Sequence, residues 1–422
     1  PDRQWDIDLY IQGKIQPLTA NKKLLYNDFN TEDTIKKDKQ GIKVKKSLFQ
    51  RFEGTLVNII PDNFIAYLNK HNIRIFHKVY DIIKQTLFKV AELIVKAVRF
   101  IINLLYLIKT WLKHLFTDPK TEKQFRTYDL IHLPLMQHYP PFRRTKSRIL
   151  VTVHDLTHRY YPKFHTPINI SNAEKGLRFI TRSEADVIAV SDSTFRDTLK
   201  ECRINKEKVH LVYEAAEKDK FRFILNRDET GKVKKKYGIP LDGPFFLCLS
   251  TIEPRKNLTN TIRAFTKLIE ENKDYNVNLV IAGKKGWSFD KLYLHNKVLS
   301  KRIVFTGFVD DKDLSALYSE TLALCYISFY EGFGLPILEA MNCMSPVIYG
   351  DNSSMPEIVG DGGLPADPEN IDDIKQKMKQ IFENRKLRKQ IRKMALKKSL
   401  KFSWRNTIID TLKVYDQIIN HS

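Results

Sequence analysis

The sequence contains few cysteines, and none of them is spaced for a metal site. Cys202, Cys248, Cys325 and Cys343 stand alone among 422 residues, without a C-x-x-C pair or a neighbouring histidine cluster. This pattern excludes the common zinc motifs, and a reducing compartment is the easier fit. Cys248 and Cys325 lie inside apolar runs, where a cysteine usually packs as a small hydrophobic residue.

The sequence also lacks a secretory signal and any uncharged run long enough to cross a bilayer. It begins at Pro1 without a methionine, so we expect its start to be trimmed. In the apolar segment 81–116 the longest uncharged run covers nine residues, 100–108, about half of what a spanning helix needs. The charged side chains of this segment fall on one helical arc. The pattern fits a helix in a membrane interface and also a helix packed against a sheet, and both interpretations stay open.

Acidic residues are outnumbered: 71 Lys and Arg stand against 49 Asp and Glu, a net charge of +22. The positive potential favours an anionic partner, which could be nucleic acid, an acidic membrane face or a phosphorylated small molecule. No zinc-finger spacing or aromatic RNA-binding signature accompanies the charge, so we do not expect nucleic acid to be the partner.

Length and a hydrophobic content of 42% predict two α/β domains. A first short strand is predicted at 5–11. From Tyr128 onward, short apolar runs alternate with helical stretches, which predicts parallel sheets with helices on both faces and ligands at the carboxyl ends of the strands. The polar stretch 214–235 is predicted to be the linker. The predicted strands are 130–133, 149–154, 187–191, 209–212, 245–250, 277–282, 303–306, 322–327 and 346–349, and the predicted helices include 193–202, 258–270, 311–320 and 335–342.

Two cations occupy a predicted strand-to-helix turn. The strand 245–250 runs into a turn containing Arg255 and Lys256, before a helical pattern that starts at Leu258. A phosphorylated ligand would approach this edge of the sheet, where Arg offers a planar fork and Lys a point charge.

A glycine loop follows the strand at 322–327. Its glycines permit a tight turn close to a ligand, and Pro336 suits the first turn of the next helix. The N–H groups and the positive dipole end of that helix could seat a diphosphate without a metal ion. Glu331 precedes the loop and Glu339 lies one turn into the helix, so that one carboxylate could accept hydroxyls of a transferred sugar and the other those of a ribose.

No D-x-D pair is evident at a strand end, so we expect no metal site. Asp310, Asp311 and Asp313 are instead typical of the acidic first turn of a helix.

These motifs resemble those of the retaining glycosyltransferases of family 4, which have the GT-B fold. The resemblance lies in residues 250–257, 304–309 and 331–340, with further similarity at 153–157, 185–191 and 402–404. It extends roughly from Tyr128 to the end of the sequence, and within the family it points to bacterial mannosyltransferases of lipopolysaccharide and capsule assembly. It implies an α/β protein with two Rossmann-like domains facing a cleft and a C-terminal helix that crosses back to the N-terminal domain.

The resemblance also implies domain boundaries. Residues 1–215 would form the acceptor-binding domain, with a basic helical insertion at about 36–120. Residues 216–402 would bind the nucleotide sugar, and 403–422 would be the terminal helix.

Site residues follow from the same resemblance. Donor phosphates would be bound by Arg255, Lys256, Gly334 and Leu335, the donor sugar by Glu331, Gly332 and Phe333, the ribose by Glu339, and the nucleobase by Phe308 and Val309. His154 would lie across the cleft near the reacting sugar, and His154 and Glu331 would be the catalytic residues.

The sequence departs from the family pattern in several places. The strand and glycine loop expected before segment 6–11 are not present, so either the chain is trimmed or this acceptor-side loop is lost. Many relatives carry an arginine in the phosphate loop where this sequence has Ser250 and Thr251. Arg255 would then take over the role of that arginine. The usual Asn-Gly before the linker reads Glu214-Ala215-Ala216, and the Lys-rich insertion has no assignable counterpart.

We therefore expect a retaining enzyme that moves a hexose from a nucleoside-diphosphate sugar to a lipid-linked or growing glycan. We expect it to need no cofactor, and the departing phosphate to take the proton of the acceptor. The basic charge favours an anionic membrane surface, which would place the protein at the cytoplasmic face of the inner membrane. Two alternatives are an epimerase or hydrolase of nucleotide sugars on the same fold, and a non-catalytic scaffold subunit. Transfer of sugar to an acceptor would distinguish the enzyme from both.

Overall fold

The computed structural model describes residues 8–11, 14–17, 128–139, 142, 145–284 and 302–420. The chain divides into two compact units, Pro1–Ile108 and Lys109–Ser422. In the first unit, the structure describes an antiparallel hairpin of β1 (Asp8–Ile11) and β2 (Lys14–Pro17).

Part of the strand predicted at 5–11 is therefore confirmed as β1. The predicted amphipathic helix 81–116 and the predicted insertion 36–120 lie outside the described residues.

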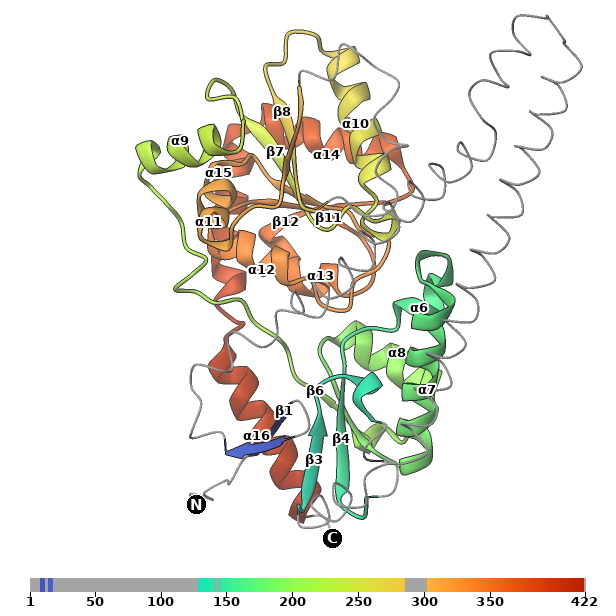
Figure 1. The fold of residues 1–422 in the computed structure, drawn as a ribbon. Coiled ribbons are helices and arrows are strands. Elements are labelled where there is room, and N and C mark those ends of the chain that lie inside the picture. Colours follow the sequence, from blue (N-terminus) through green and yellow to red (C-terminus); the bar gives the residue numbers. More distant parts are fainter. Residues whose placement is uncertain are drawn as a thin grey trace, which may run out of the picture. The chain divides into compact units, whose positions relative to one another are not determined.

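The second unit contains a four-stranded parallel sheet in the order β3-β4-β5-β6 (Figure 1). The described helices α6, α7 and α8 connect its strands and end at polar or left-handed residues, as helices of this kind commonly do. The elements are β3 (Leu130–Leu133), β4 (Arg148–Val153), α6 (Thr157–Tyr160), α7 (Pro167–Ser183), β5 (Asp186–Ala189), α8 (Asp192–Cys202) and β6 (Val209–Leu211).

A six-stranded parallel sheet in the order β12-β11-β10-β7-β8-β9 follows in the chain. Its strands are β7 (Phe245–Leu249), β8 (Asn278–Ala282), β9 (Ile303–Gly307), β10 (Leu324–Tyr326), β11 (Val347–Gly350) and β12 (Gly363–Ala366). Its helices are α9 (Arg227–Lys236), α10 (Leu258–Glu271), α11 (Asp311–Glu320), α12 (Leu335–Asn342), α13 (Met355–Val359), α14 (Ile371–Glu383) and α15 (Arg385–Ser399).

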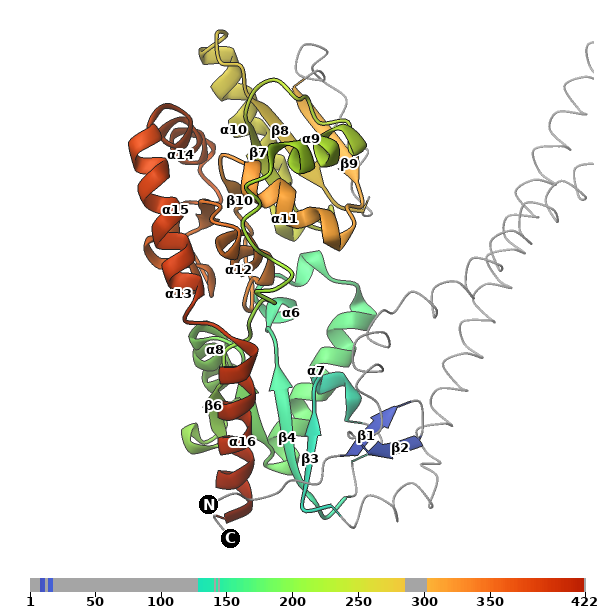
Figure 2. The same ribbon diagram turned by 90° about the vertical axis from the view of Figure 1, so that its left-hand side faces the viewer.

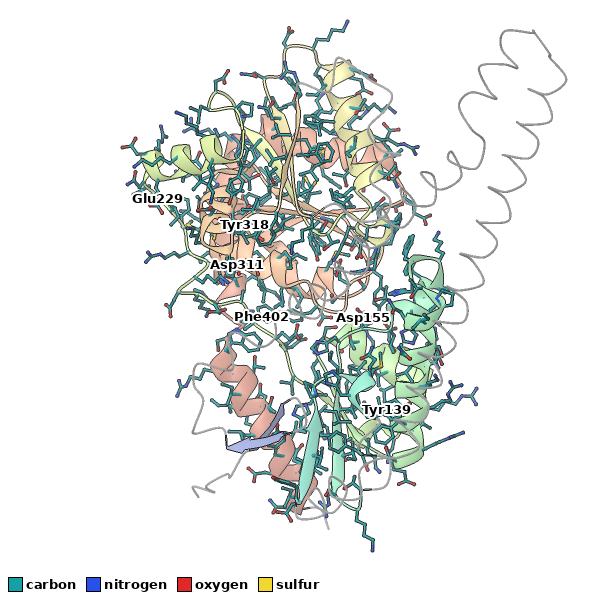
Figure 3. The ribbon with its side chains drawn as sticks, in the orientation of Figure 1. Tyr139, Asp155, Glu229, Asp311, Tyr318 and Phe402 are labelled. Atoms are coloured by element: carbon teal, nitrogen blue, oxygen red, sulfur yellow. The ribbon has the colours of Figure 1, made fainter. Side chains whose placement is uncertain are left out.

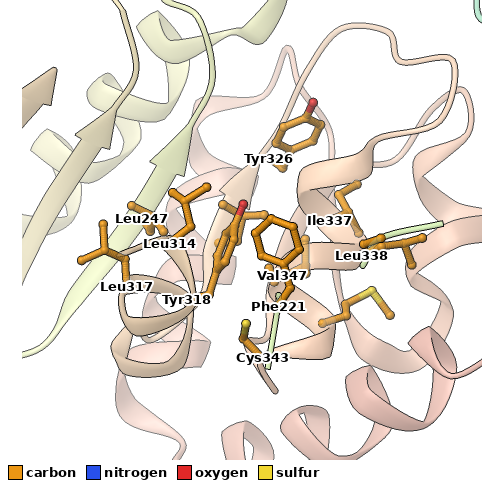
Figure 4. Packing of buried hydrophobic residues seen from close by; sticks show 14 of the residues in the cluster. Phe221, Leu247, Leu314, Leu317, Tyr318, Tyr326, Ile337, Leu338, Cys343 and Val347 are labelled. Atoms are coloured by element: carbon orange, nitrogen blue, oxygen red, sulfur yellow. The ribbon is translucent and has the colours of Figure 1, made fainter. Parts of the chain in front are cut away.

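Helices cover both faces of this sheet, which is why its strands read as continuous apolar runs. Along β7, Phe245 and Leu247 join one buried cluster. Figure 4 shows Leu247 of this cluster together with Tyr318 of α11. Phe246 joins the other cluster, together with Phe265 of α10. Successive side chains of a strand point to opposite faces, so this alternation places β7 between two apolar layers.

Most predicted elements of this unit are confirmed, and two differ. The helices 311–320 and 335–342 begin and end as predicted. The stretch 214–235 is not linker throughout, because α9 forms in it: the Asn226 side chain caps its first turn, which is acidic, while its last turn carries three lysines. Strand β12 was not predicted, since Gly363-Leu364-Pro365-Ala366 carries little strand signal.

The last helix, α16 (Trp404–Asn420), packs on the four-stranded sheet. Val414 and Ile418 join Leu150 of β4 and Ile188 of β5 in a buried cluster. Phe402, labelled in Figure 3, lies just before the helix and packs edge-on against Phe333, with ring centroids 6.1 Å apart, in a cluster of the six-stranded sheet. The C-terminal segment therefore contacts both sheets, as predicted. In the described part of the chain, no helix is both long and apolar enough to span a membrane.

A carboxylate from α13 joins the two sheet layers. Glu357 accepts hydrogen bonds from the backbone N–H groups of Asp192 and Ser193 at 3.0 Å each, and from the hydroxyl of Tyr213 at 2.9 Å. The first N–H groups of a helix have no partner within the helix and carry partial positive charge. Glu357 thus caps α8 from the other half of the unit.

The glycine loop touches the end of β4 beside this cap. The Thr194 hydroxyl lies 3.3 Å from the carbonyl oxygen of His154 and 3.2 Å from that of Gly332. A β-carbon at position 332 would lie 1.8 Å from the His154 oxygen. A glycine is therefore required for the loop to approach β4 this closely.

Ile418→Ala should lower the free energy of unfolding by about 2 to 4 kcal/mol, because it leaves a cavity between α16 and the four-stranded sheet. The matched control is Ile408→Ala on the same helix, where the residue is 58% exposed. That change should stay within about 0.5 kcal/mol. Urea denaturation followed by circular dichroism measures both, and equal effects would contradict the assigned docking of α16.

Gly332→Ala should lower the free energy of unfolding by more than about 2 kcal/mol, because the new methyl group meets a backbone oxygen that cannot move aside. Gly231 in α9 has no atom within 4 Å of an added β-carbon, so Gly231→Ala is the control. It should stabilise the protein by up to about 1 kcal/mol. Thermal unfolding of the two variants tests this, and a neutral Gly332→Ala would refute the tight contact.

Candidate functional site

The turn after β7 is held against the loop that follows β10. Pro254–Lys256 form a 3-10 turn, and Asn257 leaves it in the left-handed region with φ of 54° before α10 begins. The N–H of Phe329 donates to the carbonyl of Arg255 at 3.0 Å. Both segments lie at the carboxyl ends of neighbouring parallel strands, so their side chains meet at one edge of the sheet.

Glu331 binds both predicted phosphate-binding cations. Its carboxylate oxygens lie 2.6 Å from Nζ of Lys256 and 2.9 Å from a terminal nitrogen of Arg255. The Glu331 side chain is 8% exposed. Burial alone would raise the pKa of Glu331, but the charges of Lys256 and Arg255 outweigh it and lower that pKa. The three residues therefore form a buried, ionised cluster.

Neighbouring groups complete this cluster. Nζ of Lys256 donates to the Tyr326 hydroxyl at 2.9 Å, and Arg255 also pairs with Glu253 at 2.9 Å. Burial lowers the pKa of Lys256, but its interactions with Tyr326 and with the Glu331 carboxylate outweigh it, so that its pKa is raised. Sequence reasoning missed Tyr326 and Glu253. The one sequence signal for Tyr326 is its hydroxyl group at the end of an otherwise apolar strand.

Helix α12 begins at the glycine loop with its N-terminus uncapped by any side chain that the structure describes. Gly334 is the N-cap with φ of 100°, a conformation that favours glycine, and Pro336 occupies the first turn as predicted. The Ser354 hydroxyl oxygen lies 3.0 Å from the carbonyl oxygen of Glu331 and 2.9 Å from that of Phe333, so its one proton links the side chain to the loop. The arrangement leaves backbone N–H groups and the positive helix end available to an anion.

Glu339 lies apart from the Glu331 cluster, in the second turn of α12. It accepts a hydrogen bond from the Tyr318 hydroxyl at 2.8 Å. Burial raises the pKa of Glu339 to about 7, although the Tyr318 bond and the charge of Lys220 oppose the shift. Because its folded-state pKa exceeds the usual value of 4.5, the stability that this group contributes is present below pH 4.5 and is lost as the pH rises through about 7.

His154 follows β4, and both of its ring nitrogens lie near oxygen acceptors. Nδ1 lies 2.9 Å from a Glu214 carboxylate oxygen, and Nε2 lies 3.0 Å from the carbonyl of Pro134. Burial lowers the pKa of His154, but the Glu214 bond and charge outweigh it, so that its pKa is raised above 6.5. Two acceptors favour the doubly protonated ring. The role of Glu214 was not predicted. The one signal was that Glu214-Ala215-Ala216 stands where the family usually has Asn-Gly.

The structure separates the other predicted residues. The side chains of Phe333 and Val309 are buried in the apolar cluster that also contains Tyr318, at 4% exposure each. Phe308 is 56% exposed, and Nζ of Lys284 lies 5.0 Å from its ring centroid. Leu335 is the first residue of α12 and is exposed. Ligand contacts of Phe333 and Val309 could therefore come only from their backbone.

The predicted acid cluster lies at the start of α11. Asp310 and Asp313 both pair with Nζ of Lys236, at 2.7 and 2.6 Å. Among the residues that the structure describes, no group of three or more His, Cys, Asp and Glu side chains is arranged to hold a metal ion. Cys248 and Cys325 are buried, as predicted.

Solved structures share this architecture. Anabaena HepE, crystallised with UDP and glucose, superposes with a TM-score of 0.59 at 17% sequence identity, over 71% of this chain and 80% of that one. A glycosyltransferase from Rickettsia africae gives a TM-score of 0.57 at 21% identity, over 73% and 80%. WaaG, a lipopolysaccharide glycosyltransferase, gives 0.53 at 15% identity, over 65% and 78%. The likeness confirms the predicted GT-B fold class.

Sequence relatives agree. O-antigen chain mannosyltransferase B of Escherichia coli is 31% identical over 271 residues, 64% of this chain and 70% of that protein. The serotype-specific mannosyltransferase WbdA of Escherichia coli is 31% identical over 225 residues, 52% of this chain but only 27% of its own length. Residues 229–398 match the family profile described as glycosyl transferases group 1. The chain therefore belongs to the group 1 glycosyltransferases.

Proposed function

We propose that this glycosyltransferase moves a hexose, mannose in the first instance, from a nucleoside-diphosphate sugar to a lipid-linked or growing glycan with retention of configuration. The sugar is suggested by the 31% identity to an O-antigen chain mannosyltransferase. The observation that carries the donor site is one juxtaposition: the uncapped N-terminus of α12 directly follows the loop in which Glu331 gathers Arg255 and Lys256.

The donor diphosphate would lie against this helix end, on the N–H groups of Gly334 and Leu335. Lys256 and Arg255 add charge beside it. The amide dipoles are fixed by the loop and the helix, and fixed charge stabilises a transition state more than mobile charge does. The protein would thereby supply the positive field that the leaving diphosphate needs.

Glu331 would exchange partners when the donor binds. Its two carboxylate oxygens face Lys256 and Arg255. Donor phosphates that recruit these cations would release carboxylate oxygen for the hydroxyls of the donor sugar, which the N–H groups of Gly332 and Phe333 also approach. Glu339 would accept the ribose hydroxyls, and the nucleobase would border Phe308 and the backbone of Val309.

In the proposed step the acceptor oxygen bonds to the anomeric carbon of the donor sugar while the bond from that carbon to the phosphate oxygen breaks. The acceptor proton passes to the departing diphosphate on the same face, which accounts for retention. The added charge on the diphosphate is stabilised by α12, Lys256 and Arg255.

His154 would act as a cation near the reacting sugar. Both ring nitrogens bond to protein oxygens, so neither is placed to remove the acceptor proton. Its carbonyl lies against Gly332, which puts the ring at the same edge as the glycine loop. A protonated ring there adds to the positive field around the donor.

The remaining proposals concern the whole protein. Residues 1–215 would bind the acceptor, 216–402 the nucleotide sugar, and 403–422 would link them. A lipid-linked acceptor would bring the protein to an anionic membrane surface, on the cytoplasmic face of the inner membrane.

Lys256→Ala should weaken binding of the preferred nucleotide sugar by about 10- to 100-fold, the loss expected for one charge-assisted hydrogen bond. A thermal-shift panel of UDP- and GDP-sugars identifies that donor, since a ligand at 100 times its Kd adds about 2.7 kcal/mol of stability. Lys267→Ala is the control, because Lys267 is an exposed lysine that pairs with Asp372.

Glu331→Gln should abolish transfer to acceptor while donor binding persists. Turnover that only rearranges or hydrolyses the sugar would support an epimerase or hydrolase instead. A wild-type protein that binds no nucleotide sugar would refute the enzyme proposal and favour a scaffold.

Donor binding should weaken as the pH falls from 8 to 6. Glu339 has a pKa of about 7 and must ionise to accept ribose hydroxyls fully, so donor binding in acid has to expel its proton. Calorimetry with a nucleotide sugar at pH 6, 7 and 8 should show up to about a tenfold loss per pH unit below the pKa. Glu339→Gln should bind more weakly and lose this dependence. An equally steep profile in Glu339→Gln would assign the titration to another group.

A further inference from the structure

Helix α15 is a strongly basic element without acidic side chains. Residues 384–409 contain no Asp or Glu, whereas 385–401 contain nine Lys and Arg. A solvated helix face usually mixes both signs of charge. The neighbouring α14 does so: Lys375 pairs with Glu271 at 2.7 Å and Lys377 with Asp373 at 3.4 Å.

Three exposed lysines of α15 form a row. Lys389, Lys393 and Lys397 are spaced four residues apart and are all exposed. Residues at this spacing lie on one face of a helix. Within the described part of the chain, none of these three ammonium groups has an ion-pair partner. The row therefore presents uncompensated positive charge to solvent.

Large exposed apolar side chains follow α15 in the chain. Leu400 is 56% exposed in the turn between the helices, and on α16 Trp404 and Ile408 are 43% and 58% exposed. Trp404 and Ile408 again lie four residues apart, while α16 buries Val414 and Ile418 against the sheet. Figure 2 shows α15 and α16 following one another along one side of the unit.

We propose that this surface, the α15–α16 ridge of Lys389, Lys393, Lys397, Leu400, Trp404 and Ile408, docks the protein on an anionic lipid surface. The lysines complement acidic head groups, and each such cation near the surface contributes to binding. Trp and aliphatic side chains beside them suit the boundary between head groups and acyl chains. A nucleic acid would use the lysines but give Leu400 and Ile408 no partner.

The inference rests on the proposed lipid-linked acceptor, which would give an enzyme reason to sit on a membrane. It differs from the earlier expectation for segment 81–116, because it assigns the contact to α15 and α16. Variants of the ridge can therefore be tested in the full chain with the remainder of the sequence unchanged.

The test is co-sedimentation of the full chain with phosphatidylcholine vesicles that contain about 30% phosphatidylglycerol. This anionic fraction is chosen to give the vesicles a negative surface potential on the order of −30 to −50 mV. The triple variant Lys389→Glu, Lys393→Glu and Lys397→Glu should bind on the order of 100-fold more weakly at low salt. The matched control carries the same charge change at exposed lysines of α9 and α11, as Lys232→Glu, Lys235→Glu and Lys312→Glu. It should bind within about threefold of the wild type.

A second variant tests the apolar part. Vesicles should shift the tryptophan emission of the wild type to shorter wavelength, and Trp404→Phe should lose part of that shift. Leu400→Ser with Ile408→Ser should release the protein from vesicles at lower salt than the wild type. All changes are at exposed positions, and unchanged melting temperatures verify that the variants fold.

Several outcomes overturn the inference. Equal loss in the two triple variants would mean that only net charge matters, and no vesicle binding by the wild type would exclude the membrane. An RNA oligonucleotide that binds through the same lysines, with vesicles inert, would reassign the ridge. A wild type that binds nucleotide sugars but not vesicles leaves the proposed activity intact, whereas vesicle binding without nucleotide-sugar binding refutes the activity alone.

Discussion

The site depends on the burial of one carboxylate between two cations. Glu331 follows β10, whereas Arg255 and Lys256 follow β7, and the ion pairs join the two loops at 2.6 to 2.9 Å. A buried carboxylate without partners would be strongly unfavourable, so the loops cannot separate unless another anion replaces Glu331 or another cation replaces the pair. The cluster that resembles a ligand site therefore also stabilises the buried charge of Glu331.

A second set of contacts sets the register between the two sheets. Glu357 caps α8, Thr194 lies between two carbonyls, and Gly332 lets one of those carbonyls, that of His154, come close. These are polar and steric contacts of small groups, and they differ from the aromatic packing of Phe402 next to them. Short polar contacts fix relative position more sharply than an apolar surface does, since hydrogen bonds weaken steeply with distance and angle.

Sequence reasoning succeeds here where the information is local. Helix α12 could be bounded because Gly334 and Pro336 act within a few residues, and the strands could be found because burial on both faces leaves apolar runs. It fails where partners are distant. The pairing of Lys256 with Glu331 joins residues 75 positions apart, so no local pattern shows that the two residues proposed for different ligand groups bind each other. Likewise, nothing near Phe308 and Val309 indicates which of them faces solvent. Helix α9 is hard to predict for another reason: its charged sequence resembles a linker, and Asn226 is the one local signal of its start.

The docking of α16 has a consequence for how the chain is made. His132 on β3 bonds to Tyr415 across a separation of 283 residues, and Leu150 and Ile188 are covered by side chains of the same final helix. During synthesis from the N-terminus, the sheet positions that α16 covers must therefore stay uncovered until α16 has left the ribosome. Contacts of such long range also slow folding, because the loop must close before the contact can form. The four-stranded half is translated first, yet it is completed last.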